Sequence, residues 1–103
     1  MTELGMPKTT YVLQVATKFA SFTDASRDAA DEIAAHIARS KAFHARGELL
    51  MAGAFLDVDG EALSTMAILT TREAAEDYAN GDPLVLNGMV SEWSVREWAN
   101  IVA

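Results

Sequence analysis

Apolar residues recur with two different periods along the chain, and the change of period marks the predicted elements. Residues 10–19 are rich in β-branched and aromatic side chains with an alternating pattern, which predicts a strand. Residues 21–27 suit a loop followed by a helix start, and residues 29–46 are strong helix formers. The helix is expected to end at Gly47 and to present one face made of Ile33, His36, Ile37, Ser40, Phe43 and His44.

The second half of the chain repeats this plan with two strands before a helix. Residues 49–56 and 62–70 are strand-like and flank a turn whose Asp59-Gly60 pair favours a hairpin. Thr71 is suited to cap a helix that ends near Asn80-Gly81.

Asp82 and Pro83 then favour a short helical turn over residues 84–87, because Asp is a good N-cap and Pro suits the first helical position. A last strand follows at residues 90–99. The order β-α-β-β-α-β predicts an α+β, ferredoxin-like fold with a four-stranded antiparallel sheet and both helices on one face.

The strands are apolar on both faces, which a sheet covered by helices on one side does not explain. The alternation is expected to place Leu63, Ala67 and Leu69 opposite Met66 and Ile68 in the third strand, and Trp93 and Val95 opposite Val90 and Trp98 in the fourth. A second copy of the chain is the simplest cover for the second face. The pattern therefore predicts a homodimer in which two sheets pack together.

Composition narrows the function classes. The 103 residues carry a formal net charge of −7, and their eight Lys and Arg are scattered, so nucleic-acid binding is not expected. The absence of cysteine excludes disulfides, thiolate metal sites and thiol nucleophiles. No secretion signal or membrane-spanning run is recognisable, which favours a cytoplasmic protein without membrane attachment. We expect residues 1–9 to form a flexible lead-in and residues 10–103 to form one domain.

Strong local motifs for nucleotide binding, zinc hydrolysis or serine nucleophiles are missing. The stretch Asp57-Val-Asp-Gly-Glu61 has a faint likeness to a calcium loop but lacks its spacing, so a hairpin turn is favoured and no metal or cofactor is expected.

His36 is the main candidate for chemistry, because imidazole is the side chain best suited to proton transfer near neutral pH. The structural alternative is a histidine whose hydrogen bonds are satisfied between helix and sheet. Asp82 has two interpretations as well: it caps a helix, or it orients and charge-stabilises His36, and the two roles are compatible. His44 is interpreted as structural near its helix end. The aromatic residues are expected either to wall an apolar pocket or to be core: Tyr11, Phe43, Phe55, Trp93 and Trp98.

Five segments of the chain together resemble a known family. They are His36-Ile-Ala-Arg, Arg46-Gly-Glu-Leu-Leu-Met-Ala-Gly53, Ala74-Ala-Glu-Asp-Tyr-Ala-Asn-Gly-Asp82-Pro83, Gly88-Met-Val and Val95-Arg96-Glu-Trp98. In order and spacing, over about residues 10 to 99, they resemble the YCII-related family of the dimeric α+β barrel superfamily. Two departures are Ala54, where the family usually has Pro, and Glu97, where it has Pro before an aromatic residue.

The resemblance implies a ferredoxin-like protomer whose sheet packs on its twin to form a dimeric α+β barrel, with a cleft where a His and an Asp meet. Those positions fall on His36 and Asp82, and the resemblance implies that the two form a catalytic pair. One relative is a dehydrochlorinase, and muconolactone isomerase belongs to the wider superfamily.

The sequence thus leaves three hypotheses for a small-molecule site. The first is a cofactor-independent lyase or isomerase that uses His36 and Asp82 for proton transfer on a small cyclic substrate. The second is a non-catalytic binding or accessory domain, and the third is cofactor-free oxygenation. Tyr78, Arg39 and Arg96 are further candidates for the cleft, which the sequence does not rank.

Overall fold

The computed structural model describes residues 7–57 and 60–102. The elements follow in the order β1 (Thr9–Thr17), α1 (Phe22–Asp28), α2 (Ala30–Ala45), β2 (Leu49–Ala54), β3 (Ser64–Leu69), α3 (Arg72–Asn80), α4 (Pro83–Leu86) and β4 (Val90–Ala99). The predicted β-α-β-β-α-β order is confirmed, with α1 as a short addition and with α4 at the predicted short helical turn. Strand β1 begins one residue earlier than predicted, and most of the predicted lead-in, residues 1–6, lies outside the described residues.

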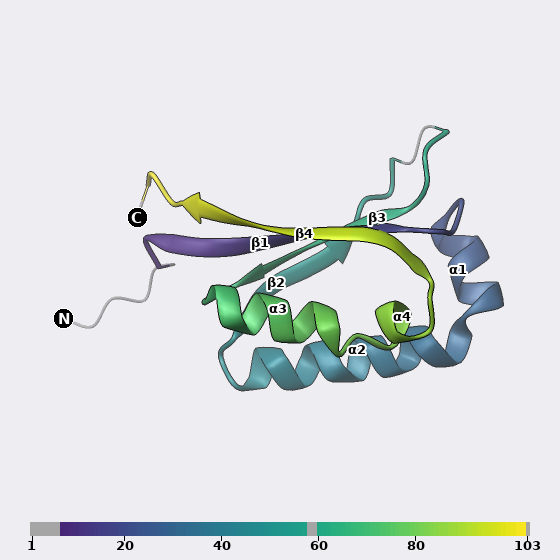
Figure 1. The fold of residues 1–103 in the computed structure, drawn as a ribbon, viewed down its shortest axis with the longest axis horizontal. Coiled ribbons are helices and arrows are strands. Elements are labelled where there is room, and N and C mark those ends of the chain that lie inside the picture. The colour runs from purple at the N-terminus through teal and green to yellow at the C-terminus, as the bar shows by residue number, and fades with distance from the viewer. Residues whose placement is uncertain (1–6, 58–59, 103) are drawn as a thin grey trace.

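The four strands form one antiparallel sheet in the order β2-β3-β1-β4. The helices lie on one side of this sheet, and no helix of the described chain covers the other side (Figure 1). This arrangement confirms the predicted ferredoxin-like α+β fold. We call the two sides of the sheet the helix face and the open face.

Helices α1 and α2 differ from the prediction, which had a loop and then one continuous helix. The hydroxyl of Ser21 accepts from the backbone N–H of Asp24 at 3.1 Å and starts α1 as a separate helix. Ala29, with φ −138° and ψ 39°, breaks the chain between α1 and α2. Neither Gly nor Pro marks this break, so the sequence carried no signal for it. At the other end of α2, Gly47 has a φ of 80° and closes the helix as predicted.

The two predicted caps of the second half are confirmed. The Thr71 hydroxyl accepts from Ala74 N–H at 3.0 Å at the start of α3, and an oxygen of Asp82 accepts from Leu84 N–H at 2.9 Å at the start of α4. The short helix α4 begins with Pro83. These caps fix the direction of the chain on both sides of Asp82.

Strands β2 and β3 pair antiparallel as predicted, but each is shorter than expected. The pairing stops at Ala54 and Thr65, and the connection spans residues 55–63. Gly60 has a φ of 84°, which only glycine adopts without strain, while Asp59 of the predicted turn lies outside the described residues.

The core lies between the sheet and α2 and α3, and it contains Leu13, Val15, Phe43, Leu49, Ala67, Leu69, Ala74, Ala75, Tyr78 and Ala79. Trp93 and Val95 both pack against it, which agrees with their predicted place on one shared side of the strand. Val90 also packs against it, which corrects its predicted place on the opposite face. The register between β1 and β4 shifts after Ala16, so Thr17 pairs with Val90, and the bulge turns Val90 to the helix face.

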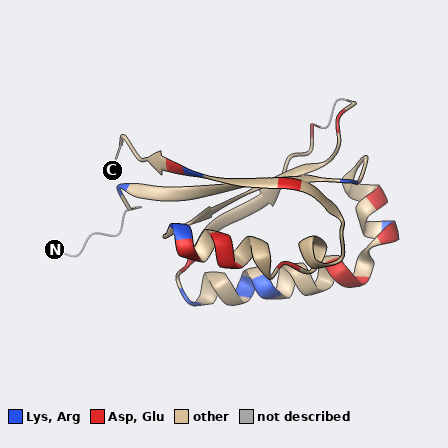
Figure 2. Cartoon of the chain, viewed as in Figure 1, with Lys and Arg blue, Asp and Glu red and all other residues tan. Residues whose placement is uncertain are grey.

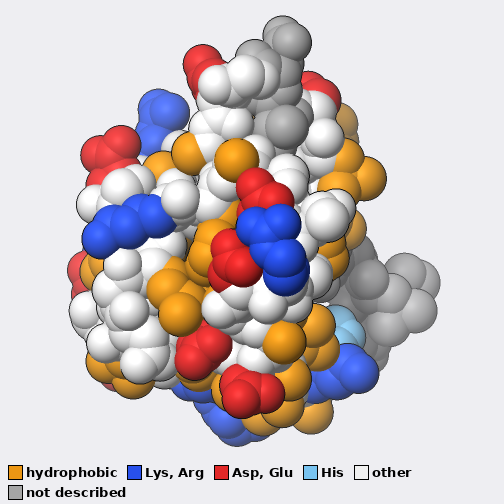
Figure 3. All heavy atoms as spheres, turned by 90° about the vertical axis from the view of Figure 1, so that its right-hand side faces the viewer, with side chains coloured by type: hydrophobic (Ala, Val, Ile, Leu, Met, Phe, Trp, Pro, Cys, Tyr) orange, Lys and Arg blue, Asp and Glu red, His pale blue; other side chains and the backbone are white. Residues whose placement is uncertain are grey.

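Charged residues are concentrated on the helices, whereas β1, β2 and β3 carry none (Figure 2). At the end where α1 lies, acidic and basic side chains are interspersed with hydrophobic patches (Figure 3). The open face presents Met51 and Trp98, which are 59% and 54% exposed. In the residues that the structure describes, no helix has the length and apolar character needed to cross a membrane.

Candidate functional site

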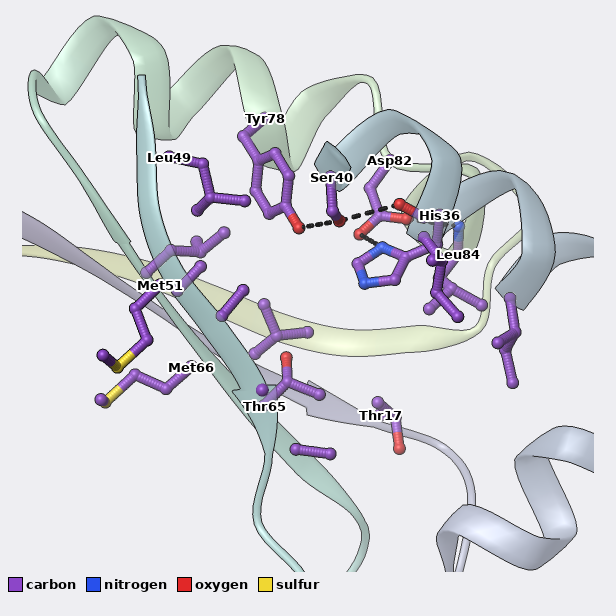
Figure 4. Close-up of a pocket in the computed structure, with 18 of the residues that line it drawn as sticks. Thr17, His36, Ser40, Leu49, Met51, Thr65, Met66, Tyr78, Asp82 and Leu84 are labelled. Atoms are coloured by element: carbon purple, nitrogen blue, oxygen red, sulfur yellow. Dashed lines mark hydrogen bonds and ion pairs between the residues drawn. The ribbon is translucent and has the colours of Figure 1, made fainter. Parts of the chain in front are cut away.

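A cavity of about 510 Å³ lies between α2 and strands β1, β2 and β3 (Figure 4). This volume falls in the range of small-molecule sites, about 300–1,000 Å³. Most of its wall is apolar, with contributions from Leu13, Val15, Ala25, Ile33, Leu49, Ala67 and Leu84. A few polar side chains converge at the end near α3 and α4: His36, Ser40, Tyr78 and Asp82.

The structure brings the two predicted site residues into contact. His36 Nδ1 lies 3.0 Å from Asp82 Oδ2, although the residues are 46 positions apart in the chain. The Asp82 side chain is only 6% exposed and that of His36 is 25% exposed. An ionised carboxylate accepts hydrogen bonds and does not donate them, so the hydrogen of this contact belongs to His36 Nδ1. Nε2 is then the unprotonated nitrogen of the neutral ring.

Asp82 makes the contacts that both of its interpretations require. Its Oδ1 accepts from Leu84 N–H and caps α4, while its Oδ2 accepts from His36. Burying a carboxylate is costly unless its oxygens are hydrogen-bonded, and here both oxygens have a partner. Because the cap holds one oxygen, the other is aimed at α2 in a fixed orientation.

A second contact lies one turn further along α2. The Ser40 hydroxyl donates to the carbonyl oxygen of His36 at 2.8 Å and is in hydrogen-bond contact with the Tyr78 hydroxyl. Ser40 follows His36 by four residues and Tyr78 precedes Asp82 by four, so the two contacts lie one helical turn apart between α2 and the α3–α4 segment. We call each of these two side-chain contacts a rung. Burial, together with the nearby Asp82 carboxylate, raises the pKa of Tyr78, which therefore stays protonated at neutral pH.

Arg39 binds the backbone of the same segment from outside the cavity. Its guanidinium donates to the carbonyl oxygens of Tyr78 at 2.6 Å and Asp77 at 2.8 Å, near the end of α3. A Cβ atom on Gly81 would lie 2.4 Å from Arg39 Nη2, so glycine makes room for the guanidinium. Arg39 does not line the cavity; its contacts hold the chain just before Asp82.

His44 also borders the cavity, but its partner differs. Its Nδ1 lies 2.8 Å from the carbonyl oxygen of Leu49, across the turn that joins α2 to β2. A carbonyl oxygen accepts a hydrogen bond without supplying a formal charge. The contact agrees with the structural interpretation of this histidine.

The five aromatic residues proposed for the pocket wall do not line this cavity. Tyr11, Phe43 and Trp93 belong to the core or pack against it, whereas Phe55 and Trp98 are exposed. The aromatic lining comes instead from Phe19, Phe22 and Tyr78. Phe19 and Phe22 flank the start of α1, the helix that the pattern did not separate, so the sequence offered no signal for them.

Arg96 does not reach the cavity either. It pairs with Val12 in the register of β1 and β4, which places it on the open face of the sheet. Among residues 7–57 and 60–102, no group of three His, Asp or Glu side chains is arranged to hold a metal ion.

A family model, the YCII-related domain, matches residues 10–99. This chain belongs to the YCII-related family. The match spans all four strands except Thr9, and it includes both His36 and Asp82. Of the two departures from the family pattern, Ala54 lines the cavity, whereas Glu97 lies near the Tyr11 hydroxyl, away from His36.

Solved structures share the fold of this YCII-related protein at low sequence identity. A 5-chloro-2-hydroxyhydroquinone dehydrochlorinase (TftG) from Burkholderia phenoliruptrix, in complex with 2,5-dihydroxybenzoquinone, superimposes with a TM-score of 0.67 at 15% identity, over 88% of this chain and 94% of that one. NE2512 from Nitrosomonas europaea, a protein of unknown function, has a TM-score of 0.54 at 14% identity, over 93% and 91%. Rv0793 from Mycobacterium tuberculosis gives 0.51 at 14%, over 90% and 94%. Among functionally curated proteins, none matches the sequence.

Proposed function

We propose that this YCII-related protein is a cofactor-independent lyase or isomerase that uses His36 and Asp82 to move a proton on a small cyclic substrate. The observation that carries the proposal is the contact of 3.0 Å between His36 Nδ1 and a buried, capped carboxylate beside a mostly apolar cavity. A relative in fold, TftG, is named as a dehydrochlorinase and was solved with a cyclic quinone, which supports the choice of substrate class.

In the proposed reaction His36 Nε2 accepts a proton from the substrate and becomes an imidazolium. Asp82 holds the Nδ1–H and stabilises the positive charge that develops on the ring. In an elimination, the electron pair of the broken C–H bond forms the new double bond, and the leaving group departs with the electrons of its own bond. In an isomerisation, His36 returns the proton to a different atom of the substrate.

The surroundings favour this use of the pair. The mostly apolar wall lowers the local dielectric and so strengthens the attraction between imidazolium and carboxylate. The cap contact to Leu84 N–H prevents the carboxylate from turning toward solvent. His36 is therefore held at one orientation before a substrate enters, which lowers the cost of reaching a reactive geometry.

The test is an NMR titration of the two imidazoles in wild type and in Asp82→Asn. Asn is as good an N-cap as Asp, so the variant keeps α4 while removing the charge. We expect His36 to lose its proton more readily in Asp82→Asn than in wild type, because a lost opposite charge disfavours the protonated ring. The resonances are assigned with His36→Gln and His44→Gln.

His44 is the internal control for this titration, because the chain has only two histidines and His44 contacts a neutral carbonyl. Its midpoint should stay where it is in Asp82→Asn. An unchanged midpoint for His36 would leave Asp82 as a helix cap and His36 as a structural residue. The non-catalytic binding domain, for which the cavity is equally suited, would then be the better proposal.

We also propose that the protein is a homodimer in which the open faces of two sheets meet. Strands β1, β2 and β3 carry no charge, and this face holds Val12, Met66 and Ile68 together with the exposed Met51 and Trp98. Its charged residues, Arg96 and Glu92, lie on the edge strand β4. An apolar sheet face of this kind is costly to leave in water. A second copy is self-complementary to it by symmetry.

The dimer is tested by light scattering after gel filtration. Wild type should have the mass of two chains, and Ile68→Glu on the open face should have the mass of one, because the carboxylate would be buried without a partner. Leu86→Glu is the matched control, since Leu86 is 70% exposed on α4, on the other side of the sheet. A monomeric wild type would contradict the proposal.

A further inference from the structure

The Ser40–Tyr78 rung leaves a polar group in the cavity that the proton transfer does not use. Tyr78 is only 3% exposed, yet it lines the cavity together with His36, and the centroids of the two rings are 6.1 Å apart. Its hydroxyl points toward Ser40 (Figure 4). The ring of Tyr78 is held on its other side by Phe43, edge-on at 5.1 Å between centroids. Its position therefore does not depend on the hydroxyl alone.

The direction of the hydrogen bonds in this rung follows from counting hydrogens. A serine hydroxyl has one hydrogen, and that of Ser40 is donated to the carbonyl of His36 at 2.8 Å. Ser40 is therefore the acceptor in its contact with Tyr78, and the tyrosine hydroxyl is the donor. If the Tyr78 hydrogen turned toward another acceptor, Ser40 would keep its own bond to His36.

Tyr78 can thus exchange Ser40 for another acceptor at a small cost in free energy to the protein. A bound oxygen that accepts from Tyr78 replaces Ser40 as acceptor, and a serine oxygen with one remaining bond loses little. In a mostly apolar cavity, a preplaced donor of this kind selects ligands by the position of an oxygen atom. The phenol also stays protonated at neutral pH because burial raises the pKa of Tyr78, so it remains a donor.

We propose that the Tyr78 hydroxyl is a second ligand contact, which donates a hydrogen bond to an oxygen substituent on the far side of a ring that faces His36. The ligand class is a small ring with oxygen atoms at two separated positions, one near His36 and one near Tyr78. Ser40 holds the hydroxyl while the cavity is empty. The inference rests on the proposed function for the position of the ring beside His36.

The test compares two probes of the same shape, hydroquinone and p-cresol, in which a methyl group replaces one hydroxyl. Binding is followed under nitrogen by shifts in amide NMR spectra of wild type, Tyr78→Phe and Ser40→Ala. We expect wild type and Ser40→Ala to bind hydroquinone about two- to tenfold more tightly than p-cresol, the value of one neutral hydrogen bond. Tyr78→Phe should lose this preference and keep its affinity for p-cresol.

The two variants separate a ligand contact from a structural role. Both remove the Ser40–Tyr78 bond, but only Tyr78→Phe removes the donor, so a loss of preference in both would overturn the inference. A preference that persists in Tyr78→Phe would overturn it too, as would equal affinity or no binding of the two probes to wild type. The titration of His36 in Asp82→Asn is measured without any ligand, so failure of this inference is distinct from failure of the proposed function.

Discussion

The two histidines of α2 lie eight residues apart on one face of the helix, and both border the cavity, yet their surroundings differ. At the His36 end, a buried carboxylate contacts the ring, and two rungs and the Arg39 contacts fix the neighbouring segment. At the His44 end, the ring contacts one backbone carbonyl in a turn. The difference teaches that the partner of the imidazole, more than its helix or its exposure to the cavity, makes His36 rather than His44 the candidate for proton transfer.

The largest expected difference between the two ends is in turnover. In a screen of chlorinated hydroquinones and hydroxylated lactones, any turnover by wild type should fall about 10²- to 10⁴-fold in His36→Gln, the usual contribution of a general base. His44→Gln should stay within about twofold. Equal losses in the two variants, measured by product formation, would remove the distinction between the histidines.

The second largest difference is expected in the loss of stability when each of the two histidine contacts is removed. Asp82→Ala removes a cap and leaves Leu84 N–H unpaired in the interior, so the free energy of unfolding should fall by about 2 kcal/mol. Asp82→Asn retains the cap and should lose less, and His44→Ala should lose about 1 kcal/mol with its single hydrogen bond. Urea unfolding followed by circular dichroism measures all three. A larger loss in His44→Ala than in Asp82→Ala would contradict the comparison.

Alkaline pH should lower the stability of the end of the cavity that contains Tyr78. Burial raises the pKa of Tyr78 above its ordinary value of 10.0, so the unfolded chain releases this proton at lower pH than the folded one. The contribution of Tyr78 to the free energy of unfolding is therefore fully present below pH 10. It is lost as the pH rises toward the pKa of Tyr78 in the folded protein. Unfolding by urea at pH 9 and pH 11 should show a smaller drop in Tyr78→Phe than in wild type. The same drop in both proteins would assign the loss to other groups.

The smallest effect concerns the contact between Arg39 and Gly81. Gly81→Ala should destabilise wild type by about 1 kcal/mol or less, because its Cβ displaces the guanidinium. In an Arg39→Ala background the same change should be neutral or slightly stabilising, since the backbone of Gly81 has a φ of −99° that alanine tolerates. A double-mutant cycle gives the coupling, and additive effects would show that the guanidinium is not held at Gly81.

Elements with explicit local chemistry were predictable from the sequence. The side chains of Thr71 and Asp82 accept from free backbone N–H groups at helix starts, and Gly47 takes a positive φ at a helix end. The chemistry of these residue types therefore predicts where the helices begin and end. Strand β4 was predicted with its observed bounds, residues 90–99. The face of α2 was predictable too, because its apolar period is a property of the helix alone.

Other features depended on contacts between distant segments. The bulge after Ala16 reverses the side on which Val90 lies, and the break at Ala29 has no residue that marks it. The sequence identified His36 and Asp82 as candidates, and the family resemblance joined them, but the distance of 3.0 Å and the single free nitrogen of His36 come from the packing of α2 against the start of α4. The Ser40–Tyr78 rung was not predicted, because serine and tyrosine have no local pattern that pairs them across 38 residues.

The sequence by itself therefore determined the order of the elements apart from α1, the caps at Thr71 and Asp82 and the residue types available for proton transfer, since these depend on near neighbours in the chain. Tertiary structure alone decided which oxygen meets which nitrogen, which aromatic rings line the cavity and which face Val90 joins. A hydrogen bond forms within a few tenths of an ångström of its ideal length, and that precision arises only when whole elements pack together.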